Sequence, residues 1–219
     1  MSKGDGRKSS GAIQMEALIL YFVLFFPGIY TSPMTELIPF SMLRELGRTM
    51  TYTLPSLALL WYILPDKKGF SVLSKQKPRK KDIFPFITGL PGLIIIGLLI
   101  SLLVPLFSGI KAPAQVEGPS GIPGWIVVVF SCISTGYLEE SYFRHYLLTK
   151  IETPVTIRIA ISTVLFSFCH MYEGPWGILN AVLAGVLLSV IFIRFRSLHG
   201  IAWAHGAYNI FVYLMASLG

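Results

Sequence analysis

The segment 134-STGYLEESYFRHYLL-148 places two adjacent carboxylates, an arginine and a histidine directly behind an uncharged apolar run that begins at Gly118. A charged side chain at membrane depth costs at least a few kcal/mol, so these residues need a reason to be there. The residues that follow are helix formers and aromatics, and the first helix breaker is Pro154. The segment therefore predicts one long helix that continues to about Lys150 and holds Glu139 inside the bilayer, roughly 16 Å from the end of the helix.

The composition is that of a membrane protein. Of the 219 residues, 53% are hydrophobic and 13% are charged, and the mean hydropathy is +0.66. A soluble domain carries about 25% charged residues. Cys132 and Cys169 both lie in apolar runs, which favours buried core residues over a disulfide framework. The length suits a single membrane domain over residues 1–219.

Seven apolar stretches have about the length that a spanning helix needs. They cover residues 12–30, 49–64, 83–107, 125–138 or beyond, 155–172, 176–193 and 198–218. The first follows three basic residues, as a signal peptide would, but no small-x-small cleavage site follows it. We interpret it as a retained span. The sequence thus predicts an all-α, polytopic transmembrane bundle of about seven spans.

The basic residues alternate between the two sides of this predicted bundle. Of the 18 Lys and Arg residues, 15 fall on one side, and the other side holds 3, including Arg44 and Arg48 in the predicted loop after the first span. The positive-inside rule then predicts a cytoplasmic N-terminus. The basic loop 67–81 is interpreted as a topology signal, with a lipid head-group site as the alternative. Because the basic residues flank spans and do not alternate with exposed aromatics, no nucleic-acid partner is predicted.

The two glutamates lie on different faces of the predicted helix. Residues four apart share a face, so Glu140 and Arg144 predict an ion pair within the helix. Glu139 lies about 100° around, on the stripe that carries Ser131 and Thr135, and has no basic partner on that stripe. We expect this stripe to face a polar cleft. An unpaired carboxylate in such a cleft is a candidate general base.

Two further motifs place polar residues at depth. The sequence FSFCH puts Phe166 and His170 on one face of a predicted span, and HGAYN puts His205 and Asn209 on one face of the last span. Taken alone, His170 could be an interfacial histidine. It also lies deeper than the others, about 24 Å from Pro154, a mismatch that a tilted or displaced helix would remove.

In this order, the motifs EExxxR (Glu139 to Arg144), FxxxH (Phe166 to His170) and HxxxN (His205 to Asn209) resemble those of the CPBP family of intramembrane endopeptidases. This family is also called the CAAX protease or Abi family. The resemblance covers about residues 125–219, whereas residues 1–124 carry no family signal. We therefore divide the membrane domain into three N-terminal spans and a catalytic core. The resemblance also implies a multi-pass protein of a bacterial or archaeal cell membrane.

The resemblance implies that Glu139 activates water with help from His170, and that His205 and Asn209 stabilise the oxyanion. The second glutamate and the arginine of the first motif would support the site. These residue types fit peptide hydrolysis, which needs a base for water and donors for the developing oxyanion. We expect no cofactor. The alternative is a catalytic zinc on Glu139, His170 and His205, but no HExxH motif is present and Asn209 suits an oxyanion better than a zinc ion.

Three functions are compatible with this pattern. The first is an intramembrane endopeptidase acting in the lipid bilayer on a membrane-associated peptide or protein tail, lipidated or not. The second is a non-catalytic bacteriocin-immunity or scaffold protein that keeps the fold. The third is a small transporter with a proton relay. The intact glutamate, histidine and asparagine set favours the first over the second, and the lack of an evident internal repeat weighs against the third.

Overall fold

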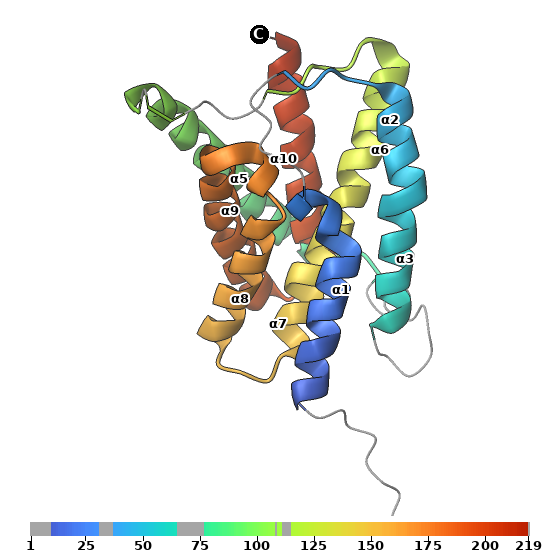
Figure 1. The fold of residues 1–219 in the computed structure, drawn as a ribbon, viewed down its shortest axis with the longest axis vertical. Coiled ribbons are helices and arrows are strands. Elements are labelled where there is room, and N and C mark those ends of the chain that lie inside the picture. The colour runs from blue at the N-terminus through green and yellow to red at the C-terminus, as the bar shows by residue number, and fades with distance from the viewer. Residues whose placement is uncertain (1–9, 31–36, 65–76, 108, 111–114, 219) are drawn as a thin grey trace, which may run out of the picture.

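The structure is a computed structural model that describes residues 10–30, 37–64, 77–107, 109–110 and 115–218 (Figure 1). These residues form helices joined by turns and irregular segments, with one isolated bridge between Ile38 and Val116. The described part of the chain contains seven helical segments and no strands. The prediction of an all-α fold is confirmed.

Three of the segments are single helices: α1 (Ser10–Tyr30), α8 (Val155–Phe168) and α10 (Leu198–Leu218). The other four combine helix types without a break or nearly so. They are α2, η1 and α3 (Met42–Arg48, Thr49–Thr53, Leu54–Ile63); η2, α5 and η3 (Lys80–Asp82, Ile83–Leu103, Val104–Leu106); α6, η4 and α7 (Gly121–Glu140, Ser141–Tyr146, Leu147–Lys150); and η5 with α9 (Met171–Glu173, Gly174–Phe195).

Each predicted apolar stretch falls on one of these segments, but two boundaries differ. Helix α2 begins at Met42, so the prediction that Arg44 and Arg48 lie in a loop is wrong. The first turns of α2 are polar and escape a search for apolar stretches, yet the Ser41 hydroxyl caps them by accepting a hydrogen bond from the Arg44 backbone N–H. Helix α8 ends at Phe168 and not at residue 172, because the chain turns there toward η5.

Among the described residues, three helical segments are long and apolar enough to cross a membrane: Lys80–Leu106, Gly121–Lys150 and Met171–Phe195. Shorter apolar helices cover Gly11–Phe26 and Val155–Phe168. These features indicate an integral membrane protein. The count of seven spans and the cytoplasmic N-terminus stay predictions, and much of the basic loop 67–81 lies outside the described residues.

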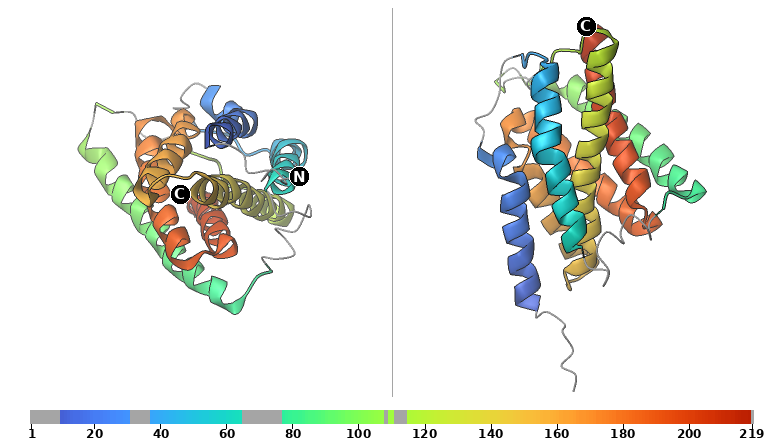
Figure 2. Two further views of the ribbon diagram at one scale, coloured as in Figure 1. Left: turned by 90° about the horizontal axis from the view of Figure 1, so that it is seen from below. Right: turned by 90° about the vertical axis from the view of Figure 1, so that its right-hand side faces the viewer.

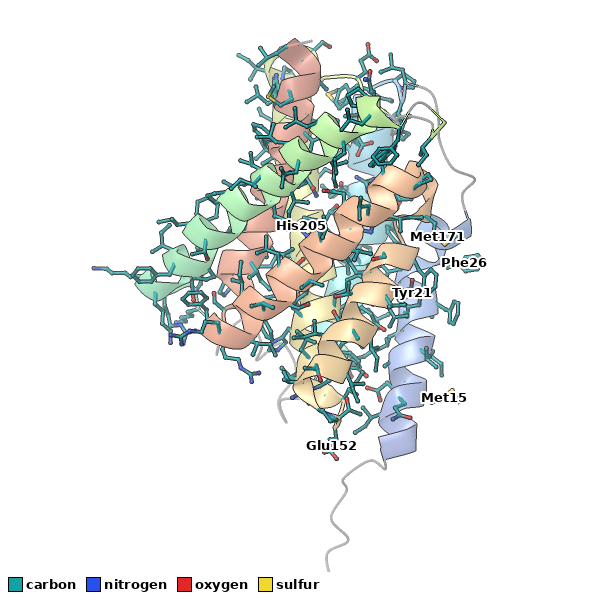
Figure 3. All side chains as sticks on the ribbon, turned by 90° about the vertical axis from the view of Figure 1, so that its left-hand side faces the viewer. Met15, Tyr21, Phe26, Glu152, Met171 and His205 are labelled. Atoms are coloured by element: carbon teal, nitrogen blue, oxygen red, sulfur yellow. The ribbon has the colours of Figure 1, made fainter. Side chains whose placement is uncertain are left out.

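The outer surface of the bundle is apolar, as contact with lipid requires. Helix α1 shows this plainly, because Met15 and Phe26 point away from the other helices and are 60% and 50% exposed, whereas Tyr21 points inward and is buried (Figure 3). The Tyr21 hydroxyl donates to the carbonyl of Leu165 at 2.8 Å. One face of α1 is therefore bound to α8, while the opposite face is largely exposed.

Successive helices run in alternate directions, so the start of α1 and the end of α10 lie at opposite ends of the bundle (Figure 1). Helices α6 and α10 pack together along much of their length, and α5 runs obliquely across α9 and α10 (Figure 2). Helices α1 and α3 lie on the opposite side of α6 from α5. The centre of the bundle is thus formed by α6 and α10, which carry the first and third motifs.

Two glycines allow α6 and α10 to approach closely. A Cβ atom on Gly136 would lie 2.8 Å from the carbonyl oxygen of Ala202, and one on Gly206 would lie 3.0 Å from the Cα atom of Ile133. The first distance is shorter than real Cβ atoms show and the second is tighter than nearly all of their contacts, so larger residues at either position would push the helices apart. The glycine after His205 therefore lets the third motif reach α6.

The long helix predicted to end near Lys150 is confirmed, and it contains an unpredicted π-helical stretch at Ser141–Tyr146. This stretch is almost wholly buried, and Tyr142, Phe143 and Tyr146 are 0–1% exposed. A π-helical turn packs more residues into a turn than an α-helix and is frequent at functional sites. It begins immediately after Glu140.

Candidate active site

The first motif forms a buried ion pair at the end of α6. Arg144 Nη1 lies 3.0 Å from Glu140 Oε1, and both side chains are 0% exposed. This is the pair that the four-residue spacing predicted. Removing one member of such a pair is costly, because the other charge would stay buried without a partner.

Arg144 also joins the first motif to the second. Its guanidinium lies 4.4 Å from the centre of the Phe166 ring, within cation–π range, and its Nη2 donates to the carbonyl of Gly185 at 3.4 Å. Arg144 thereby ties η4 to α8 and α9. The role of Phe166 in its motif is explained by this contact, since an aromatic face is needed beneath the cation.

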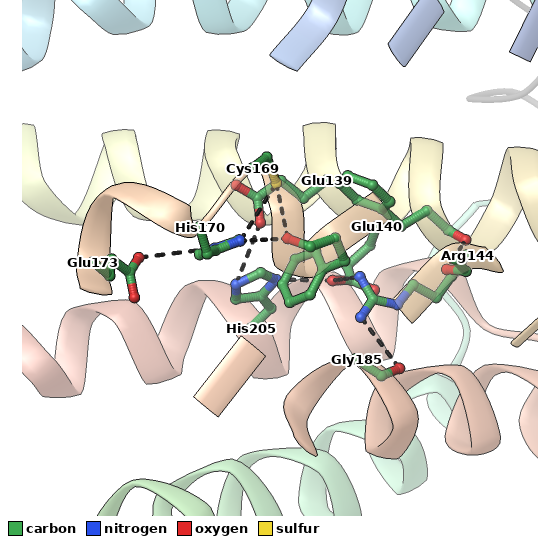
Figure 4. A network of polar contacts seen from close by, with 11 residues as sticks. Glu139, Glu140, Arg144, Cys169, His170, Glu173, Gly185 and His205 are labelled. Carbon is green, nitrogen blue, oxygen red and sulfur yellow. Dashed lines mark hydrogen bonds and ion pairs between the residues drawn. The ribbon is translucent and has the colours of Figure 1, made fainter. Parts of the chain in front are cut away.

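His205 reaches across from α10 and touches both glutamates (Figure 4). Its Nδ1 donates to Glu140 Oε1 at 2.8 Å, and its Nε2 lies 3.6 Å from Glu139 Oε2. The imidazole is 8% exposed. Glu140 therefore binds Arg144 and His205 with the same oxygen, and it fixes the orientation in which His205 presents Nε2 to Glu139.

Glu139 lies at the edge of this cluster. Its side chain is 13% exposed, and Oε2 is buried without a hydrogen-bond partner among the described residues. Tyr52 and Tyr172 lie within electrostatic range of this carboxylate. A buried carboxylate oxygen without a donor is rare and calls for an explanation such as a bound water or a catalytic role.

His170 lies in the turn that follows α8. It is therefore not part of the helix along which its distance of about 24 Å from Pro154 was calculated. Its Nδ1 donates to the carbonyl of Phe166 at 2.7 Å, and its Nε2 lies 4.0 Å from Glu173 Oε1. Its ring centre is 4.5 Å from that of Phe166, which is in turn 5.9 Å from His205. The two histidines are therefore neighbours of one phenylalanine.

Asn209 lies one helical turn after His205 and is half-buried. Its side chain makes no hydrogen bond to the described residues. The structure thus brings Glu139, Glu140, Arg144 and His205 into direct contact, with His170 beside them, and leaves Asn209 without a partner in the cluster. Its role in binding an oxyanion stays a prediction.

Sequence reasoning missed three residues that surround the cluster. Glu173 and Tyr172 follow His170 within one turn, and the ring centres of Tyr172 and His170 are 6.3 Å apart. Tyr52 comes from the N-terminal half, where its hydroxyl donates to the carbonyl of Leu24. The acidic residue three positions after His170 was a usable signal, whereas no sequence pattern connects Tyr52 with the motifs.

The zinc alternative requires Glu139, His170 and His205 to converge on one point. In the described part of the chain, no group of three or more His, Cys, Asp or Glu side chains is arranged to hold a metal ion. Nε2 of His205 faces Glu139 at 3.6 Å, whereas the carboxylate near Nε2 of His170 is Glu173. As placed, these donors do not fit a zinc ion.

Residues 121–211 match the family model described as "Type II CAAX prenyl endopeptidase Rce1-like". This match covers all three motifs and confirms the resemblance inferred from them. No curated protein and no solved structure matches the chain.

Proposed function

We propose, from the match of residues 121–211 to the type II CAAX prenyl endopeptidases, that this protein is an intramembrane endopeptidase. Its substrate is a peptide bond in a membrane-associated peptide or protein tail, which a lipid group can hold at the membrane. The observation that carries this proposal is the Glu139 carboxylate, whose Oε2 has no hydrogen-bond partner among the described residues, beside an imidazole that Glu140 orients. The coarser assignment to a CAAX-type protease rests on the family match.

Glu139 is the general base in this proposal. A water molecule bound at Oε2 gives one proton to the carboxylate while its oxygen attacks the carbonyl carbon of the scissile bond. The carbonyl oxygen then carries the negative charge of a tetrahedral intermediate. When the C–N bond breaks, the proton held by Glu139 passes to the leaving nitrogen, so the products are a carboxylic acid and an amine.

His205 and Asn209 are the proposed oxyanion donors. The hydrogen bond from Nδ1 of His205 to Glu140 leaves Nε2 directed toward the reacting atoms, and protonated Nε2 can donate to the oxyanion. Asn209, one turn later on the same helix, supplies an amide N–H. His170 assists Glu139 in activating the water, with its ring held by the Phe166 carbonyl and the Phe166 ring. This mechanism needs no metal ion.

The test uses purified protein in proteoliposomes with a peptide that carries a lipid on a cysteine near its C-terminus. Mass spectrometry of the products reports any new termini. Glu139→Gln should lower turnover by about 10²- to 10⁴-fold, because the base is lost and the shape is kept. Glu152→Gln is the matched control, since Glu152 is exposed in the loop before α8 and should leave turnover unchanged. Equal turnover by wild type and Glu139→Gln would exclude this carboxylate as the base.

A further inference from the structure

His170 faces a carboxylate that belongs to none of the three motifs. Its Nε2 lies 4.0 Å from Glu173 Oε1, at ion-pair distance, while its Nδ1 donates to the Phe166 carbonyl at 2.7 Å. Glu139 also lies within electrostatic range of this imidazole. Figure 4 shows the side chain of Glu173 on one side of His170 and the rest of the polar cluster on the other. The site therefore contains a second carboxylate–imidazole pair besides Glu139 and His205.

Two glycines fix the backbone around Glu173. Gly174 follows the turn Met171–Glu173 and has φ 77° and ψ −174°, a conformation that essentially only glycine adopts. Gly177 lies four residues after Glu173, and a Cβ atom on it would come within 2.1 Å of Glu173 Cβ and 2.8 Å of Glu173 Oε2. A side chain at either position would therefore move Glu173. The sequence MYEGPWG (residues 171–177) thus holds this carboxylate in one place.

A solvated surface glutamate is the simpler explanation, because the side chain of Glu173 is 31% exposed. Such a residue would need no special backbone conformation and no space left by a glycine. Its carboxylate would also turn outward, whereas Oε2 lies against Gly177 and Oε1 faces His170. The geometry therefore favours a positioned carboxylate over a solvated one.

The other sides of the His170 ring are already held. The Phe166 ring lies 4.5 Å away, centre to centre, and the Tyr172 ring lies 6.3 Å away and within 22° of parallel. The Phe166 carbonyl binds the Nδ1 edge. Glu173 faces the remaining edge, at Nε2. A carboxylate on the second nitrogen of a histidine defines both its ring orientation and its protons.

We propose that Glu173 is a positioning residue that holds His170 through Nε2 while His170 assists Glu139. This inference rests on the proposed function, which assigns that task to His170. With an acceptor at each nitrogen, both nitrogens are donors and the ring is positively charged. A fixed positive charge beside Glu139 stabilises the negative charge that develops when water attacks. Glu173 acts through His170 and does not contact the reacting atoms.

The separation of 4.0 Å between Nε2 and Oε1 is longer than a hydrogen bond. Hydrogen bonds within a catalytic site are often long before the substrate binds, and they shorten in the complex. Glu140 shows the shortened form of the same arrangement, since its Oε1 lies 2.8 Å from Nδ1 of His205. Each of the two histidines would then have its own orienting carboxylate.

The first test measures kcat and KM in proteoliposomes with the lipidated peptide described above. Glu173→Ala should lower kcat by about 10²-fold, because a displacement of about 1 Å at a catalytic group costs that much. KM should change by less than about twofold, since the pair acts in the transition state. Glu173→Gln keeps an oxygen that accepts from Nε2 and should recover part of the loss. Met171→Ala is the matched control, because Met171 lies in the same turn, is exposed, and should leave both constants unchanged.

Gly177→Ala tests whether the glycine serves Glu173. The added Cβ would displace Glu173 and should also lower kcat. If the glycine acts through this carboxylate, the double variant Gly177→Ala/Glu173→Ala should be no slower than Glu173→Ala alone. Losses that multiply in the double variant would contradict the role given to Gly177.

The second test does not depend on cleavage. The protein has 4 histidines, so NMR of isotope-labelled ring nitrogens in detergent micelles gives few signals, and His170→Gln identifies those of His170. Wild-type protein at neutral pH should show a proton on both nitrogens of His170. Glu173→Ala should remove the proton from Nε2, whereas Met171→Ala should keep it.

An unchanged His170 signal in Glu173→Ala would overturn the inference, as would an unchanged kcat or a KM that rises while kcat stays the same. If Glu173→Ala does not fold, Glu173→Gln replaces it in both measurements, and a smaller loss of kcat is expected. Wild-type protein that shows the NMR effect but cleaves no peptide would refute the proposed function and leave the pairing of Glu173 with His170 standing.

Discussion

Replacing Glu140 by glutamine tests how much of the stability of the bundle depends on one buried carboxylate. The substitution keeps the shape of the side chain and removes its charge. Oε1 of Glu140 accepts hydrogen bonds from Arg144 at 3.0 Å and from His205 at 2.8 Å. Glu140 and Arg144 are fully buried, so no water can take the place of the lost charge.

The magnitude follows from what remains around Arg144. Leaving one member of a buried ion pair without its partner costs about 3–5 kcal/mol. The guanidinium keeps its contact with the Phe166 ring, worth about 1–2 kcal/mol, and its weak bond to the Gly185 carbonyl. We therefore expect Glu140→Gln to lower the free energy of unfolding by about 3 kcal/mol. Glu139→Gln should change it by less than about 1 kcal/mol, because Oε2 of Glu139 loses no hydrogen bond.

The assay is denaturant titration in mixed micelles, followed by the fluorescence of the 4 tryptophans. The double variant Glu140→Gln/Arg144→Met removes both charges and should recover much of the loss, which a double-mutant cycle converts into a coupling energy. If Glu140→Gln is as stable as wild type while Glu139→Gln unfolds more easily, the two glutamates have been assigned the wrong roles.

Three further predictions concern packing, metal and topology. Gly206→Ala should destabilise the protein by about 1–3 kcal/mol and lower turnover, because its Cβ would lie 3.0 Å from Ile133 Cα and 3.1 Å from the Cys132 carbonyl oxygen and push α10 away from α6; an unchanged unfolding curve would contradict the close approach. Exhaustive treatment with a membrane-permeant chelator should leave peptide cleavage intact, whereas loss of activity that stoichiometric zinc restores would make the protein a metalloprotease. Cysteines introduced in place of Lys75 and Lys111 should be labelled from opposite sides of the membrane, and labelling from the same side would disprove the predicted orientation.

The contacts that the sequence predicted are those made within one helix. The pair of Glu140 and Arg144 follows from their spacing alone, because residues four apart on a helix meet whatever surrounds them. The continuation of the helix to Lys150 was predictable for a similar reason, since helix formers and aromatics follow the glutamates and no breaker precedes Pro154. Local periodicity was sufficient in both cases.

The contacts between helices were not predictable in this way. That His205 binds Glu140 depends on how closely α10 approaches α6, which the backbone contact at Gly206 decides. The turn at His170 depends on where α8 stops, and no glycine or proline marks that point before Gly174. Spanning helices were predicted from apolar stretches, and the start of α2 is polar, so Arg48 was assigned to a loop. Each of these features belongs to the packing of two or more segments.

The ion pairs that hold the cluster together come from α6, η4 and α10, and all of these lie after residue 120. Among the described residues, the earlier helices place Tyr52 within electrostatic range of Glu139, and they do not join those pairs. The ion-paired residues are therefore encoded in one continuous stretch of the gene. A chimera joined in the segment before α6 should therefore keep every one of these ion pairs, whichever chain supplies its first half.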